Sequence, residues 1–312
     1  MLAAAEGAKL IDENSSEASD RSFARARALS LALAAGLSDA DATAQSMADA
    51  SPAKWHLAHS SWFFETFLLE EFVPDYRPYN AEWSFLFNSY YDAKGPRVAR
   101  DRRGLLTRPS LAEIIDYRRR IDDAIVAAMP TILEQCADRL ALGIHHEQQH
   151  QELMLTDLKH LFFQNPLAPA AWPNAPDGKV HHVSDEVAWH RGGHGPVNIG
   201  AEDDYFAFDC ERPVHRHYLS AHALADRPVS NGEWIAFIED GGYATPSLWL
   251  ADGLAWVRQE GVGAPLYWRR GDDGWEHFTL SGWQPVNPSE PVAHISFFEA
   301  DAFAAWAGAR LP

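Results

Sequence analysis

The chain has 312 residues, of which 46% are hydrophobic and 12% aromatic, and its formal net charge is −18. It is long enough for two folded domains with substantial apolar cores. The negative charge argues against nucleic acid or an anionic membrane as the main partner and favours small molecules. Cys136 and Cys210 are too few for a disulfide framework, and no signal-like or membrane-length apolar segment occurs, so a cytoplasmic protein is expected.

The first half of the chain is predicted to be helical. Residues 1–20 are polar and unpatterned, which is typical of a disordered arm. Ser51 and Pro52 indicate the start of an apolar helix, Ser110 is a candidate N-cap, and Pro130 is expected to interrupt the last helical pattern. The sequence therefore predicts a four-helix bundle within residues 21–164, with helices over 21–36, 54–69, 111–129 and 131–163.

Two histidines, His146 and His150, lie four residues apart in the last predicted helix. This spacing places both imidazoles on one helix face, where they provide half of a site for iron, zinc, copper or nickel. An exposed helix with two solvated histidines is the alternative. The neighbouring His145, Gln148 and Gln149, set between apolar flanks, favour a metal site with a third ligand from elsewhere.

The helix after Pro52 offers that third ligand. His59 shares a helix face with Trp55, Trp62 and Phe63, so it is expected among buried rings, where an imidazole needs a partner. A hydrogen bond to a neighbouring helix would suffice, but bundles commonly build metal sites from facing helices, which favours ligation by His59. His56 points about 300° around the helix from His59 and is the reserve ligand.

Residues 75–108 form a long connection that is rich in aromatic residues. Its length is typical of a functional loop, and its aromatic content predicts order. A dense basic run within it is consistent either with a solvated surface or with capture of a substrate carboxylate by a bidentate guanidinium: Arg97, Arg100, Arg102, Arg103 and Arg108.

Prolines and glycine in residues 165–182 predict a linker between two domains. From residue 183 to residue 312 the pattern changes to short runs separated by Gly, Pro and Asn, with many tryptophans. Extended segments are expected at 197–200, 207–208, 215–219 and 266–268, and helices at 230–238 and 296–306.

Motifs in the first half resemble the sulfoxide synthases of ergothioneine biosynthesis: SPAKWHLAH at 51–59, FNSYY at 87–91, RRGLL at 102–106 and HEQQHQE at 146–152. Motifs in the second half resemble the formylglycine-generating-enzyme (sulfatase-modifying-factor) domain that such synthases carry: ERPVH at 211–215, PVSNGEW at 228–234, GGY at 241–243, PVAHISFFEAD at 291–301 and WAGARLP at 306–312. The combination is more specific than either half alone.

The resemblance implies a multidomain α and α+β protein. A DinB-like four-helix bundle would occupy residues 21–164, and a C-type-lectin-like domain, incomplete relative to the family, residues 183–312. The resemblance also implies a mononuclear non-haem Fe(II) held by His59, His146 and His150. The implied O2-dependent reaction joins the sulfur of γ-glutamylcysteine or cysteine to C2 of the imidazole of hercynine (trimethylhistidine) and oxidises that sulfur to a sulfoxide.

By the same resemblance, Gln149 matches the glutamine that faces the bound imidazole. Arg103, or its neighbour Arg102, matches the arginine that binds the thiol substrate. In the family the lectin-like domain continues past the Arg-Leu-Pro motif and carries the active-site tyrosine there. The catalytic tyrosine is therefore expected beyond Pro312. The 312-residue chain alone is expected to form the iron site but not to synthesise the sulfoxide, and extension with the family's remaining segment is expected to restore turnover.

Other functions compete with this interpretation. His146, Glu147 and His150 match the zinc metallopeptidase motif with Glu147 as general base, although Leu153 and Thr156 stand where the longer motif has glycine and histidine. A DinB-like thiol transferase, an ovothiol-type histidine-cysteine sulfoxide synthase and a non-catalytic binding module are further alternatives. Cys136 and Cys210 do not resemble the cysteine pair of formylglycine-generating enzymes, which argues against that activity.

Overall fold

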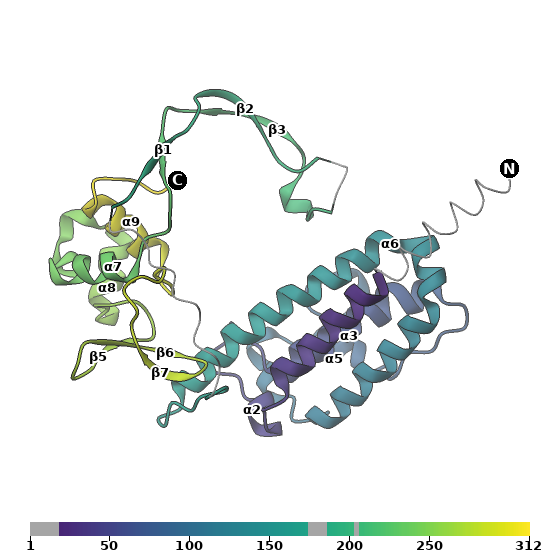
Figure 1. The fold of residues 1–312 in the computed structure, drawn as a ribbon. Helices are drawn as coiled ribbons and strands as arrows, with labels where there is room; N and C mark the ends of the chain where they lie inside the picture. Colours follow the sequence, from purple (N-terminus) through teal and green to yellow (C-terminus); the bar gives the residue numbers. More distant parts are fainter. Residues whose placement is uncertain (1–18, 174–185, 203–205) are drawn as a thin grey trace. The chain divides into compact units, whose positions relative to one another are not determined.

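The computed structural model describes residues 19–173, 186–202 and 206–312 (Figure 1). Nearly all of the predicted arm and the second half of the predicted linker therefore lie outside the described residues. The chain divides into two compact units, Met1–Ala171 and Trp172–Pro312. The first is helical and the second combines helices with small sheets, as the sequence predicts. Within the described residues, no helix is long and apolar enough to cross a membrane.

The helices of the first unit are residues 19–34, α2 (Asp39–Thr43), α3 (Ala53–Phe64) with its continuations η1 (Glu65–Leu69) and α4 (Glu70–Phe72), α5 (Trp83–Phe87), and α6 (Leu111–Gln164). Short 3₁₀ segments, η2 (Asp92–Lys94) and η3 (Arg100–Leu105), lie in the connection before α6. All twelve residues of α3 are buried, so this helix forms the centre of the bundle. Its aromatic sequence follows from that position, because no face of it meets water.

Helix α6 is two limbs that fold back on each other at Cys136, where the backbone leaves helical geometry (φ −153°, ψ 40°). The side chains of Arg118 and Glu147, 29 positions apart, approach to 2.7 Å. A straight helix would separate those residues by about 44 Å. The predicted interruption at Pro130 is wrong: a proline removes one helical hydrogen bond, and here the helix continues through it and the chain reverses six residues later.

Close packing between α3 and the second limb of α6, residues 137–164, depends on Gly143. A Cβ atom at this position would lie 2.6 Å from Cε1 of Phe64, closer than side chains can approach. The glycine stands one turn before His146, so it lets the histidine-bearing part of α6 approach α3.

The predicted N-caps have different outcomes. Ser110 caps α6, where its hydroxyl accepts a hydrogen bond from the backbone N–H of Glu113, and the Glu113 carboxylate reaches back to the Ser110 N–H. Ser51 does not cap α3: the N-cap is Pro52, without a side-chain hydrogen bond. Instead, the backbone N–H of Ser51 donates to Oδ2 of Asp157 over 2.8 Å, which ties the start of α3 to the second limb of α6.

The second unit has its core between three helices, α7 (Asn231–Glu239), α8 (Ala251–Glu260) and α9 (Phe297–Trp306). Trp234 of α7 stacks on Phe303 of α9, with ring centroids 5.0 Å apart. Helices α7 and α9 both begin with a serine capping box, at Ser230 and Ser296, as expected near these positions.

Antiparallel pairs and a three-stranded sheet complete this unit. β1 (Trp189–Arg191) pairs with β4 (Ala223–Ala225), β2 (Gly195–Ile199) with β3 (His215–Leu219), and β5 (Trp268–Arg270), β6 (Trp275–Thr279) and β7 (Gly282–Pro285) form the sheet. The predicted segment 215–219 is a strand, whereas 207–208 is not. The segment expected at 266–268 becomes a strand only from Trp268, because Tyr267 has a positive φ of 74°, which is incompatible with strand geometry.

Candidate metal centre

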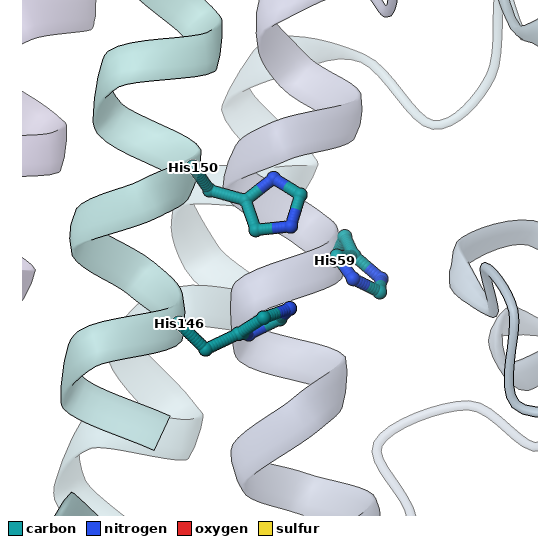
Figure 2. Close-up of side chains that lie close together, drawn as sticks. All are labelled: His59, His146 and His150. Atoms are coloured by element: carbon teal, nitrogen blue, oxygen red, sulfur yellow. The ribbon is translucent and has the colours of Figure 1, made fainter. Parts of the chain in front are cut away.

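The fold brings together the three histidines that the sequence singles out. His59 comes from α3, and His146 and His150 come from the second limb of α6 (Figure 2). Each ring offers one nitrogen, and these three atoms all lie within 4.8 Å of one another. Three imidazoles that converge in this way offer the donors of a mononuclear site and leave other coordination positions open.

One hydrogen bond and ring stacking hold His59 in place. Its Nδ1 lies 2.5 Å from the carbonyl oxygen of Phe87. A carbonyl only accepts, so Nδ1 carries the proton and Nε2 keeps a free lone pair. The ring is stacked between Trp55, at 4.6 Å, and Trp62, at 5.4 Å. The tryptophans of α3 therefore fix the plane of the His59 ring, and the carbonyl group of Phe87 fixes which nitrogen keeps the lone pair.

Burial keeps the three rings neutral. It lowers the pKa of His146 to about 4, and it holds the pKa values of His59 and His150 far below the usual range, with a further lowering from the neighbouring imidazoles. Nδ1 of His146 is buried and, within the described residues, has no hydrogen-bond partner. Its ring packs on Phe63 at 4.7 Å. Neutral, desolvated imidazoles with available lone pairs are the donor set that a divalent transition metal requires.

Arg103 places a buried positive charge beside this cluster. Its guanidinium lies 3.4 Å from the ring centroid of Trp55 and donates to the hydroxyl oxygens of Ser51 and Ser89. Burial, reinforced by the charge of Arg100, lowers the pKa of Arg103 to about 10, so it stays charged at neutral pH. Its nearest partners are hydroxyl groups, and no carboxylate of the described residues forms an ion pair with it.

The neighbouring candidates differ in position. Arg102 is exposed, whereas Arg103 is buried. Gln149 is exposed on α6 and, by helical geometry, points about 60° away from the direction of His146, beside the histidine face. Gln149 thus lies on the helix that carries His146 and His150, whereas Arg103 lies in η3 of the connection before α6, beside Trp55 of α3.

Glu147 does not reach the cluster, and its interpretation as a general base is wrong. It is fully buried on another face of α6, where its carboxylate pairs with Arg27 (2.9 Å) and Arg118 (2.7 Å) and accepts from the hydroxyl of Ser30. Burial alone would raise the pKa of Glu147, but the two guanidinium groups lower it to about 2. The match to the zinc peptidase motif is thus a coincidence of spacing in a structural ion-pair cluster.

His56 is not the reserve ligand that the sequence suggests. Its Nδ1 lies 2.9 Å from Nδ1 of His150, and its Nε2 lies 3.0 Å from Oδ2 of Asp157, so neither ring nitrogen is left for a metal. Burial lowers the pKa of His56 although Asp157 opposes the shift. Asp157 was missed from the sequence. The signal was present, because it lies seven residues after His150 and hence on the same face of α6.

Comparison with known protein families matches both units. Residues 22–154 match the DinB superfamily, and residues 183–312 match the sulfatase-modifying factor enzyme 1-like domain. The chain therefore combines a DinB-like helical bundle with a formylglycine-generating-enzyme-like domain, and its fold is mixed α and α+β.

Curated relatives align with parts of both units. The chain is 35% identical to hercynine oxygenase of Mycolicibacterium thermoresistibile over 84% of its own length and 56% of that protein. It is 34% identical to hercynine oxygenase of Mycobacterium tuberculosis over 84% of its length and 60% of that protein. A formylglycine-generating enzyme of Streptomyces coelicolor is 29% identical over 46% of the chain and 46% of that enzyme. The chain is thus similar to the hercynine oxygenases over a stretch that includes both of its units, and it spans somewhat more than half of their length.

Proposed function

We propose that this chain carries the iron centre and the substrate-binding bundle of an O2-dependent sulfoxide synthase that acts on hercynine in ergothioneine biosynthesis. The observation that carries the proposal is the convergence of His59, His146 and His150 in a chain homologous to hercynine oxygenases. In the reaction, the C2–H bond of the imidazole and the S–H bond of the thiol break, and a C–S and an S–O bond form. The two hydrogens leave as water with the second oxygen atom.

The donor set fits Fe(II). Three neutral imidazoles bind divalent iron without cancelling its charge, and the aromatic packing around His59 keeps the rings desolvated. Bound by His59, His146 and His150, iron would supply open coordination positions and the redox capacity for O2. Trp55, Trp62 and the carbonyl group of Phe87 hold the ring of His59 in place.

The substrates are assigned to the flanks of the cluster. Arg103 is a desolvated cation whose partners are two hydroxyl groups, which suits it to a carboxylate of cysteine or γ-glutamylcysteine. Gln149, beside the histidine face, offers an amide to the imidazole of hercynine. We place the reaction in the cytoplasm, because both cysteines are free thiols and the thiol substrate also requires reducing conditions.

The proposal is tested on anaerobically purified protein. One equivalent of Fe(II) should bind per chain. In the chain extended by the C-terminal segment of the hercynine oxygenases, oxygenation in the presence of hercynine and either thiol should yield the C2-linked sulfoxide, detected by mass spectrometry. Histidine in place of hercynine tests the ovothiol-type alternative in the same assay. Absence of stoichiometric iron, or product from histidine but not from hercynine, would overturn the assignment.

A further inference from the structure

His150 is connected to a buried carboxylate through a second imidazole. The chain of contacts runs from Nδ1 of His150 to Nδ1 of His56 (2.9 Å) and from Nε2 of His56 to Oδ2 of Asp157 (3.0 Å). His56 and Asp157 are 3% and 9% exposed, so water does not compete strongly for these contacts. The contacts form a continuous path from the histidine cluster to a charge outside it.

The donors along this path follow from the carboxylate. Oδ2 of Asp157 already accepts a hydrogen bond from the backbone N–H of Ser51, so Nε2 of His56 is the N–H donor in its contact with the same oxygen. A neutral imidazole has a single N–H, which leaves Nδ1 of His56 as an acceptor. Nδ1 of His150 must then be the donor. Because the one proton of His150 is on Nδ1, its Nε2 keeps the lone pair that a metal needs.

Asp157 is itself held from α3. The same oxygen, Oδ2, accepts the backbone N–H of Ser51 over 2.8 Å, immediately before the helix that carries His56 and His59. The carboxylate of Asp157 therefore connects α6 to the start of α3. Through His56, the same carboxylate also determines the tautomer of His150. Substitution of His56 would break the path while this backbone contact stays available.

We infer that His56 and Asp157 are positioning residues of the metal centre, which fix His150 in its Nδ1–H tautomer and aim its Nε2 at the metal, and that His56 is not a ligand. The inference rests on the proposed metal centre but not on the identity of the organic substrates. Metal-bound histidines commonly donate their second N–H to a carboxylate or carbonyl group. Here an imidazole is inserted between the ring and the carboxylate.

The first test compares two substitutions of His56, with Co(II) as the probe metal. His56→Leu keeps volume but removes both hydrogen bonds, whereas His56→Gln can accept from His150 with its oxygen and donate to Asp157 with its nitrogen. Competition with a chelator at fixed pH should show Co(II) affinity reduced by about 10- to 100-fold in His56→Leu and largely restored in His56→Gln. His160→Leu is the control, since His160 lies on the same limb of α6 as His150 but forms its hydrogen bond with Ser46.

The second test reads the tautomer of His150 directly and needs no metal. Long-range ¹H–¹⁵N correlation spectra of the apoprotein, with the signal assigned by its absence in His150→Ala, should show protonated Nδ1 and bare Nε2. In His56→Leu the two tautomers should mix. If His56→Leu fails to fold, the spectra of the wild type and of His56→Gln still show whether His150 is protonated at Nδ1.

Three results would overturn the inference. The first is a protonated Nε2 of His150 in the wild type, and the second is wild-type Co(II) affinity in His56→Leu. The third is the loss of one nitrogen donor from the X-ray absorption spectrum of Co(II)-loaded His56→Leu. The last would make His56 a ligand. Failure of sulfoxide formation with a normal His150 tautomer and normal Co(II) affinity would instead count against the proposed substrates alone.

Discussion

The guanidinium of Arg103 lies 3.4 Å from the ring centroid of Trp55, and Trp55 in turn stacks on His59 at 4.6 Å. A cation, an indole and an imidazole thus follow one another from the connection before α6 to the candidate metal centre. The stack holds a positive charge at a set distance from the histidines, in a buried position where it attracts an anion strongly.

We expect Arg103→Lys to weaken thiol binding through the substrate carboxylate. A lysine keeps the charge but loses the paired donors, so the Kd for cysteine in the Co(II)-loaded protein should rise by about 10-fold or more, measured by the sulfur-to-cobalt charge-transfer band. Cysteamine, which has no carboxylate, should bind equally well to both proteins. Arg102→Lys is the matched control, because Arg102 is exposed. An equal loss for cysteamine would show that Arg103 acts on the metal centre and not on the carboxylate.

Replacement of any one of His59, His146 and His150 by Ala should abolish stoichiometric Fe(II) binding, because two neutral imidazoles hold a divalent ion weakly. His145→Ala should leave it unchanged, since that ring points elsewhere and contacts Gln148. Iron bound per chain after desalting measures the effect. Equal losses from His145→Ala would contradict the assignment of the ligand face.

Glu147→Gln tests the buried ion-pair cluster. The amide leaves the buried guanidinium of Arg118 without a charged partner and leaves Arg27 with Asp122 alone, so the free energy of unfolding should fall by about 3–5 kcal/mol, measured by urea denaturation. Glu152→Gln, on the exposed side of the same limb, should change it by less than about 0.5 kcal/mol. A peptidase base would behave in the opposite way, with stability preserved and only an activity lost.

The same residue predicts part of the response to acid. The pKa of Glu147 is about 2 in the folded chain against an ordinary value of 4.5. A depressed pKa contributes stability that is fully present above pH 4.5 and is lost as the pH falls toward 2, about 3 kcal/mol in total. Denaturation curves between pH 5 and pH 2.5 should therefore converge for the wild type and Glu147→Gln. A constant difference between them over this range would contradict the shift.

Local periodicity was enough to indicate part of the site. The spacing of His146 and His150 sets their common direction on α6, and the aromatic face of α3 indicates that His59 is buried, because both properties depend on residues a few positions apart. Family motifs supplied the two-domain architecture, which the comparisons confirm. The fold class, the bundle and the cluster of three histidines were accordingly accessible without coordinates.

Contacts between distant segments decided the rest. Helical spacing alone gives Glu147 and His56 plausible roles at a metal, yet the partners that exclude those roles lie far along the chain: Arg27 is 120 positions from Glu147, and Asp157 is 101 positions from His56. The reversal at Cys136, and not at Pro130, brings Arg118 to Glu147. Periodicity determines where a side chain points around the axis of its own helix. Which neighbour that side chain meets depends on how the helices pack, and the neighbour sets the charge, tautomer and chemistry of the side chain.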